Sequence, residues 1–110
     1  MNNTIKVLIV EPEKDPRVEE ISHTLESLQQ IVGGYIQALY PFDDPVAIIC
    51  NEEGKHLGLP WNRPLYDENG RIYDIIAGTF IIAGLTKDDF GSLSDEMIEK
   101  YTAMFETTLM

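Results

Sequence analysis

The sequence predicts an α+β fold, in which two helices pack on one face of a mainly antiparallel sheet of about five or six strands. Short apolar runs rich in β-branched residues recur along the chain and are separated by turn residues, a pattern typical of strands joined as hairpins. Two other segments repeat their apolar residues at helical spacing behind a Thr or Ser that can cap a helix. The length of 110 residues is that of a single domain, residues 1–110, with a modest core.

The first third of the chain predicts a hairpin and a helix. Residues 5–10 form an apolar run that is expected to be a buried strand, and residues 17–21 are expected to be its more exposed partner. The segment EPEKDP between them contains two prolines, which block regular pairing and favour a turn. Thr24 is then expected to cap a short helix that ends at Gly33 and Gly34.

The middle of the chain predicts a second hairpin and a loop. Residues 35–40 and 46–50 are strand-like and are joined by an acidic turn. Prolines at positions 60 and 64 bracket the next segment, which is expected to be a loop because it can be neither helix nor central strand.

A further hairpin and a helix are expected after this loop. Asn69-Gly70 suits a type I′ hairpin turn, and Gly78 and Gly84 are candidates for bulges or close approaches in the strand-like residues that follow. Ser94 is expected to cap a C-terminal helix with one apolar face. That face packs on the sheet or on a second subunit, and with the small size of the chain it favours a homo-oligomer.

Charge and cysteine content limit the environment and the partners. The formal net charge is −11, from 19 acidic and 8 basic residues. Such a field repels phosphate backbones and anionic membrane surfaces, so we expect neither direct nucleic-acid binding nor membrane contact. The single cysteine, Cys50, excludes an internal disulfide, and no apolar run approaches the roughly 18 residues of a transmembrane helix. A cytoplasmic protein is expected.

No catalytic or metal-binding motif accompanies these elements. His23 and His56 lack the ligand spacing of a metal site, and neither stands in a nucleophile–base motif. Paired acids such as Asp43-Asp44 fall in predicted turns, where carboxylates are usually solvated. The sequence therefore predicts a protein that is not an enzyme and that uses neither a metal nor a cofactor.

A candidate ligand site lies in the segment 51–84, which holds five of the eight glycines and the single tryptophan. Arg63 offers a planar fork for a phosphate or carboxylate, Asn62 an amide that can read a ring edge, and Trp61 a ring on which a base can stack. The other candidate ligand-binding residues are Asn51, Gly58, Tyr73, Asp74 and Thr79. The alternative is that Arg63 pairs with one of the many acids and that Trp61 fills the edge of the core.

The stretch GLPWNRPLYDENGRIYDIIAGTFIIAG, with CNEEGK before it, resembles the family called domain of unknown function 3846. The segments VLIVEPEKDPRVEEI and TLESLQQIVGGYIQALYP resemble it too, so the similarity covers roughly residues 5–105. Residues 58–60, Asn62 and Arg63 match the family's G-L-P-x-N-R element, whereas Trp61 and Pro64 occupy positions that vary. The resemblance implies a small protein of bacteria, phages or mobile elements, without established enzymatic activity.

The genomic setting that the resemblance implies favours an anti-defence protein. In the first hypothesis, a compact homo-oligomer sequesters a nucleotide-derived immune signalling molecule, with Asn62 and Arg63 on the phosphates and aromatic rings on the base. In the alternative, the acidic protein inhibits a host defence protein by direct binding or by imitating nucleic acid. Acidic residues are spread over all thirds of the chain and favour neither hypothesis strongly. A structural or regulatory module with another partner is the third possibility.

Overall fold

The fold is a six-stranded antiparallel sheet with a separate two-stranded hairpin beside it. The computed structural model describes residues 3–106, which form two helices and eight strands. The strands of the main sheet are β1 (Thr4–Val10), β2 (Arg17–Ser22), β3 (Ile36–Leu39), β4 (Val46–Asn51), β7 (Phe80–Leu85) and β8 (Phe90–Gly91). Their order is β2-β1-β7-β4-β3, and β8 pairs with β7. The predicted α+β class and the antiparallel sheet are confirmed.

Two of the predicted hairpins build the two sides of the main sheet. Strand β1 pairs with the whole of β2 through its residues 4–9, and β3 pairs with β4, as the turn residues between them predict. The strand that joins the two hairpins is β7, which comes late in the chain and pairs with β1 on one side and β4 on the other. Its central residues, Ile81 and Ile82, are fully buried.

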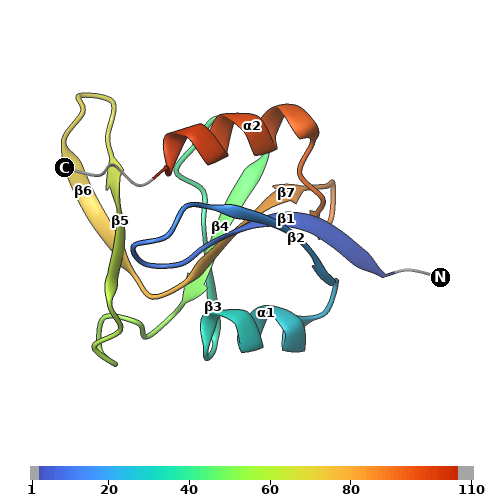
Figure 1. Cartoon of the computed structure of the whole chain (residues 1–110), viewed down its shortest axis with the longest axis horizontal. Coiled ribbons are helices and arrows are strands. Elements are labelled where there is room, and N and C mark those ends of the chain that lie inside the picture. The colour runs from blue at the N-terminus through green and yellow to red at the C-terminus, as the bar shows by residue number, and fades with distance from the viewer. Residues whose placement is uncertain (1–2, 107–110) are drawn as a thin grey trace.

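The two helices lie on opposite faces of this sheet, as Figure 1 shows, so the prediction that both cover one face is wrong. Helix α1 (Leu25–Val32) packs Leu28 and Val32 among side chains that include Ile5, Val7 and Ile9. Helix α2 (Asp95–Met104) packs on the other face, among side chains that include Leu8 and Val10.

The reason for this arrangement is visible in β1 itself. Successive side chains of a strand point to opposite faces, so a run without polar interruption exposes apolar groups on both sides. Residues 7–10 are all buried, with exposed fractions of at most 2%. A central strand of this kind needs a covering layer on each face, and the two helices supply one each.

Both helices begin at the residues that the sequence predicts. The Thr24 hydroxyl accepts a hydrogen bond from the Ser27 N–H at 3.1 Å, and the Ser94 hydroxyl accepts one from the Met97 N–H at 3.2 Å. Gly33 ends α1 with a φ of 82°, a left-handed conformation that favours glycine. These caps are local interactions, which is why the sequence alone locates them.

The apolar face of α2 packs largely on the core of its own chain. Tyr101 and Phe105 are buried in the core, and Met97 and Ile98 pack against the same cluster. The homo-oligomer, which was predicted partly from this face, therefore stays a prediction without that support. Among residues 3–106, no helix has the length and apolar character needed to span a bilayer.

The segment between prolines 60 and 64 is a strand rather than the predicted loop. Strand β5 (Trp61–Tyr66) pairs only with β6 (Ile72–Ala77), and its register shifts between Trp61 and Pro64. A two-stranded sheet with an irregular register accommodates a proline that a central strand would exclude, so the prediction that this is no central strand holds.

The turn that joins β5 to β6 is where the sequence predicts it, but its type differs. Gly70 donates to the carbonyl oxygen of Asp67 at 3.0 Å and has a φ of 77°, whereas Asn69 has no positive φ. This is a type I turn followed by a left-handed glycine, rather than type I′, which needs two positive φ angles. The Asp67 carboxylate fixes it by accepting from the N–H groups of Asn69 and Arg71.

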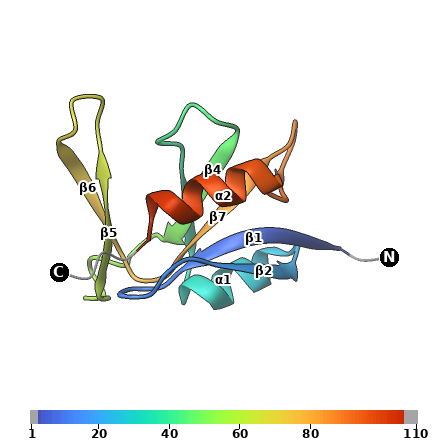
Figure 2. The same ribbon diagram turned by 45° about the horizontal axis from the view of Figure 1, so that its top comes forward.

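The β5–β6 hairpin stands at one end of the molecule, apart from the main sheet (Figures 1 and 2). The turn between β1 and β2 and the C-terminal end of α2 both point toward it in these views. Three segments that are distant in sequence therefore meet at this end, and the candidate site lies among them.

Candidate functional site

Arg63 is buried where these three segments meet, with an exposed fraction of 9%. Its Nε donates to the carbonyl oxygen of Phe105 at 3.0 Å, and its Nη2 donates to the same oxygen at 2.8 Å and to the Lys14 carbonyl at 2.5 Å. Its Nη1 donates to the Asn62 side-chain oxygen at 2.7 Å and, more weakly, to the Glu11 carbonyl at 3.4 Å. A guanidinium has five N–H donors, and all five are occupied.

The electrostatic environment of Arg63 fits a structural cation. Burial lowers the pKa of its guanidinium from the ordinary value, and the carboxylate of Asp15 opposes that shift. The group nevertheless stays charged, since an arginine is not deprotonated in proteins. Backbone carbonyl dipoles, rather than a carboxylate in direct contact, therefore carry most of its hydrogen bonding.

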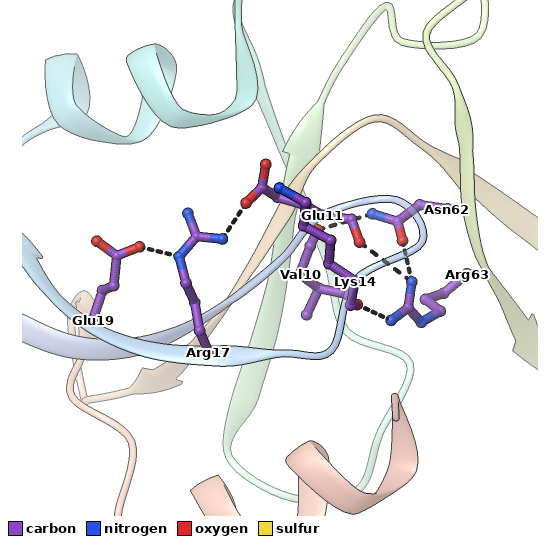
Figure 3. A network of polar contacts seen from close by, with 7 residues as sticks. All are labelled: Val10, Glu11, Lys14, Arg17, Glu19, Asn62 and Arg63. Carbon is purple, nitrogen blue, oxygen red and sulfur yellow. Dashed lines mark hydrogen bonds and ion pairs between the residues drawn. The ribbon is translucent and has the colours of Figure 1, made fainter. Parts of the chain in front are cut away.

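Asn62 extends the same network to the main sheet. Its side-chain nitrogen donates to the carbonyl oxygens of Val10 and Gly78, each at 2.8 Å, while its oxygen accepts from Arg63. Val10 ends β1, and Gly78 lies between β6 and β7. Asn62 and Arg63 thus join the hairpin to the end of β1 and to the β1–β2 turn (Figure 3). They also join it to Gly78, before β7, and to Phe105, at the end of α2.

The β1–β2 turn that this pair holds has an unusual backbone. The Lys14 N–H donates to the Glu11 carbonyl at 3.2 Å, and Glu13 has a φ of 64°, which makes residues 11–14 a type II turn with Pro12 at its second position. The third position of such a turn prefers glycine or asparagine, yet here it is a glutamate. Figure 3 shows Arg17 holding the Glu11 carboxylate from the other side, so the turn is fixed at both its backbone and its side chain.

These hydrogen bonds are not consistent with the ligand-binding role that the sequence predicts for Arg63. Arg63 has no donor left for a phosphate or carboxylate, so the direct ligand contact predicted for it is not available in this structure. The alternative role, pairing with an acid, is reduced to the electrostatic contribution of Asp15, because the hydrogen-bond acceptors of Arg63 are carbonyl and amide oxygens. Trp61 does not fill the core, since its exposed fraction is 62%.

A groove opens beside the network, between β5 and the end of α2, with a volume of about 790 Å³. Trp61, Tyr66 and Met104 line it and are exposed by 62%, 57% and 48%. Its other lining residues are Glu13, Phe42, Asn62, Arg63, Pro64, Leu65, Phe105 and Glu106. The groove is therefore mainly apolar and aromatic, with a carboxylate from the β1–β2 turn and another from the residue that follows Phe105.

The predicted site residues divide between this groove and other places. Trp61, Asn62 and Arg63 line the groove, whereas Asn51, Gly58, Tyr73, Asp74 and Thr79 do not. Asn51 is buried and ties β4 to α1, donating to the Val32 carbonyl and accepting from the Glu53 N–H. Asp74 pairs with Lys55, whose hydrogen bond lowers the pKa of the Asp74 carboxyl from its ordinary value.

The sequence did not identify several groove residues, and for most of them no local signal exists. Glu13, Phe42 and Met104 come from three separate segments that only the tertiary fold brings together. Tyr66 carried a weak signal, because it is an aromatic residue at the end of the segment already singled out around Trp61. Among residues 3–106, no group of three or more His, Cys, Asp or Glu side chains is arranged to hold a metal ion.

Comparison with known proteins gives one family and no individual relative. The chain matches no curated protein and no solved structure. The model of the family described as domain of unknown function (DUF3846) matches residues 5–106, which is nearly the whole chain and includes both the network and the groove. The chain therefore belongs to the DUF3846 family, as its resemblance to that family predicts.

Proposed function

We propose that this protein is a non-enzymatic binding protein that holds a segment of another protein in the groove between β5 and α2. One observation carries the proposal: Trp61, Tyr66 and Met104 are exposed together around a groove of about 790 Å³. Large apolar side chains grouped in a concave surface mark binding sites more often than scattered exposed residues do. Aromatic and methionine side chains are also enriched at protein interfaces.

The lining chemistry favours binding over catalysis. Among the described residues that line the groove there is no His, Cys, Ser, Thr or Lys, the usual sources of nucleophiles and neutral-pH bases. In the setting that the family resemblance implied, the bound segment belongs to a host defence protein that the binding inhibits. This is the direct-binding form of the anti-defence hypothesis.

Sequestration of a nucleotide-derived signal is the second candidate function. It is favoured by Trp61 and Tyr66, whose exposed rings border one groove and can stack a base. Against it, the donors of Arg63 are occupied, and Glu13 and Glu106 repel phosphates. We therefore rank it second.

Selection from a phage-displayed library of random twelve-residue peptides tests the proposal. We expect enriched peptides whose fluorescein-labelled synthetic forms bind the wild-type protein, measured by fluorescence anisotropy. Tyr66→Ala and Met104→Ala should each weaken that binding about tenfold, the loss typical of an interface anchor. Tyr35→Ala is the matched control, because Tyr35 is 69% exposed and does not line the groove.

Two results contradict the proposal. One is equal binding by the two groove variants and the wild type, which would place the peptide elsewhere. The other is the absence of any enriched peptide together with calorimetric binding of cyclic nucleotides or ADP-ribose derivatives, which would establish the second candidate function instead.

A further inference from the structure

We propose that the groove selects a basic segment, in which an apolar anchor side chain is flanked by Lys or Arg, and that Glu13 is the residue that reads the positive charge. This inference rests on the proposed function and adds the chemical class of the ligand to it. It is carried by the backbone of Glu13, by the charges that line the groove and by the aromatic side chains beside them.

Glu13 occupies a strained position over the groove. A φ of 64° is a left-handed conformation in which a side chain with a Cβ is unfavourable, and a type II turn prefers glycine or asparagine there. The turn is held from its backbone by Arg63 and from the Glu11 carboxylate by Arg17. These contacts hold the turn in its type II conformation, which places the strained Glu13 at the edge of the groove. Strained residues of this kind occur at ligand sites.

The accessible charge of the groove is negative. Glu13 and Glu106 are exposed carboxylates among its lining residues. Arg63 also lines it, but each of its N–H groups donates to the protein itself. A cationic side chain entering the groove therefore finds two carboxylates, whereas an anionic one finds no unoccupied cationic donor among the described lining residues.

The aromatic side chains favour the same ligand. Trp61 and Tyr66 present exposed rings in the same groove as these carboxylates, and an arginine or lysine can pack its aliphatic stem on such a ring while its charged group reaches a carboxylate. The net charge of −11 also speeds the approach of a basic partner and slows that of an acidic one. The apolar groove, the carboxylates that line it and the net charge of the protein thus all favour a basic segment with an apolar anchor side chain.

Two synthetic peptide libraries test this inference. Both consist of twelve-residue peptides without tryptophan and share Leu, Phe, Ser and Gly, but one adds Lys and Arg where the other adds Asp and Glu. Trp61 is the single tryptophan of the chain, so its emission reports occupation of the groove. We expect the basic library to shift the emission to shorter wavelength at concentrations at least tenfold lower than the acidic library.

Variants of equal charge separate recognition by Glu13 from the general attraction of an acidic protein. Glu13→Gln removes one negative charge at the groove, and Glu26→Gln removes one on α1, across the sheet from α2. We expect Glu13→Gln to weaken binding of the basic library about fivefold, the effect of an exposed ion pair of roughly 1 kcal/mol. Glu26→Gln should leave it unchanged within twofold.

The possible failures are distinguishable. If neither library changes the Trp61 emission, the groove is not a peptide site and the proposed function itself is contradicted. If both libraries bind equally, or if Glu13→Gln and Glu26→Gln have the same effect, the groove binds peptides but the selection of a basic segment by Glu13 is overturned.

Discussion

An arginine can bind a ligand or stabilise the fold, depending on whether its N–H groups donate to the ligand or to the protein itself, and Arg63 is of the second kind. Its planar fork suits a phosphate, which is why the sequence suggested a ligand contact. In the structure the fork meets carbonyl oxygens of Glu11, Lys14 and Phe105 instead. A buried arginine of this kind stabilises the fold by donating to a buried carbonyl oxygen, that of Phe105, and to the part-buried carbonyl oxygens of Glu11 and Lys14.

Replacing Arg63 should therefore destabilise the protein rather than only remove a ligand contact. We expect Arg63→Ala to lower the free energy of unfolding by about 2–4 kcal/mol, because one buried and two part-buried carbonyl oxygens lose their donor. Arg63→Lys should recover little of this loss, since one ammonium cannot replace the fork. Urea denaturation followed by circular dichroism measures the change. The exposed Arg71, replaced by Ala, is the control; an equally small effect at both positions would contradict the structural role of Arg63.

Replacing Glu13 with asparagine should increase the stability of the protein although it removes the charge that we propose binds the ligand. Asparagine tolerates the left-handed conformation better than glutamate, so Glu13→Asn should raise the free energy of unfolding by about 0.5–1 kcal/mol. Glu13→Gln keeps the strain and should leave stability unchanged. Thermal denaturation of both variants measures this difference. A loss of stability in Glu13→Asn would show that the glutamate is not strained at this position.

We expect ionisation of the Asp44 carboxyl to make the stability of the protein depend on pH. The hydrogen bonds that it accepts from Lys100 and from the Tyr101 hydroxyl lower the pKa of its carboxyl below the ordinary value of 3.8. A carboxyl with a lowered pKa in the folded state contributes stability above the unfolded pKa and loses it as the pH falls through the folded pKa.

Melting temperatures of wild type and Asp44→Asn, measured from pH 7 to pH 2, test this dependence. Asparagine keeps an acceptor for Tyr101 but not the charge. We expect the wild type to be the more stable above about pH 4, and the difference to disappear below the folded pKa of Asp44. A difference that stays constant over the whole range would show that the carboxylate charge contributes nothing.

The elements differ in how far the sequence determined them. The caps at Thr24 and Ser94 and the positions of the turns in three hairpins depend on neighbouring residues, and the sequence predicts them. The type of the β5–β6 turn is not predicted correctly. The placement of the helices on opposite faces was missed, although the unbroken apolar run of β1 carried the information, because it needs cover on both sides.

The groove could not be predicted because it depends on long-range pairing. Its lining residues lie together because β7 pairs between β1 and β4, and because Asn62 and Arg63 hold the β5–β6 hairpin against the β1–β2 turn. The sequence indicated the right segment, through Trp61, but predicted it to be a loop and assigned its arginine to the ligand. Which donors of an arginine are free is decided by the tertiary structure, and no local pattern records it.

The β5–β6 hairpin should be the less stable of the two sheets. A two-stranded hairpin is marginal alone, and this one is tied to the rest of the fold in part through the side chains of Asn62 and Arg63. We expect its amides to exchange with deuterium at least about a hundredfold faster than those of β7, whose side chains are buried. NMR-detected exchange measures this ratio, and equal protection of β6 and β7 would contradict it.

The molecule combines a strongly negative net charge with the apolar groove between β5 and α2. The acidic charge disfavours nucleic acids and anionic membrane surfaces, and beside exposed aromatic side chains it also favours a basic protein segment over a phosphate-bearing ligand. The family has no assigned function, so this combination is the strongest guide to the activity of the chain.

Chemical-shift mapping by NMR tests the central claim, that the groove is the binding site, most directly. The isotope-labelled protein is titrated with a peptide from the random library. We predict saturable shifts at the Trp61 indole N–H, along β5, at the 11–14 turn and at residues 104–106, with α1 and β3 unaffected. Saturable shifts confined to α1 or β3, or no saturable shift with any enriched peptide, would contradict the account.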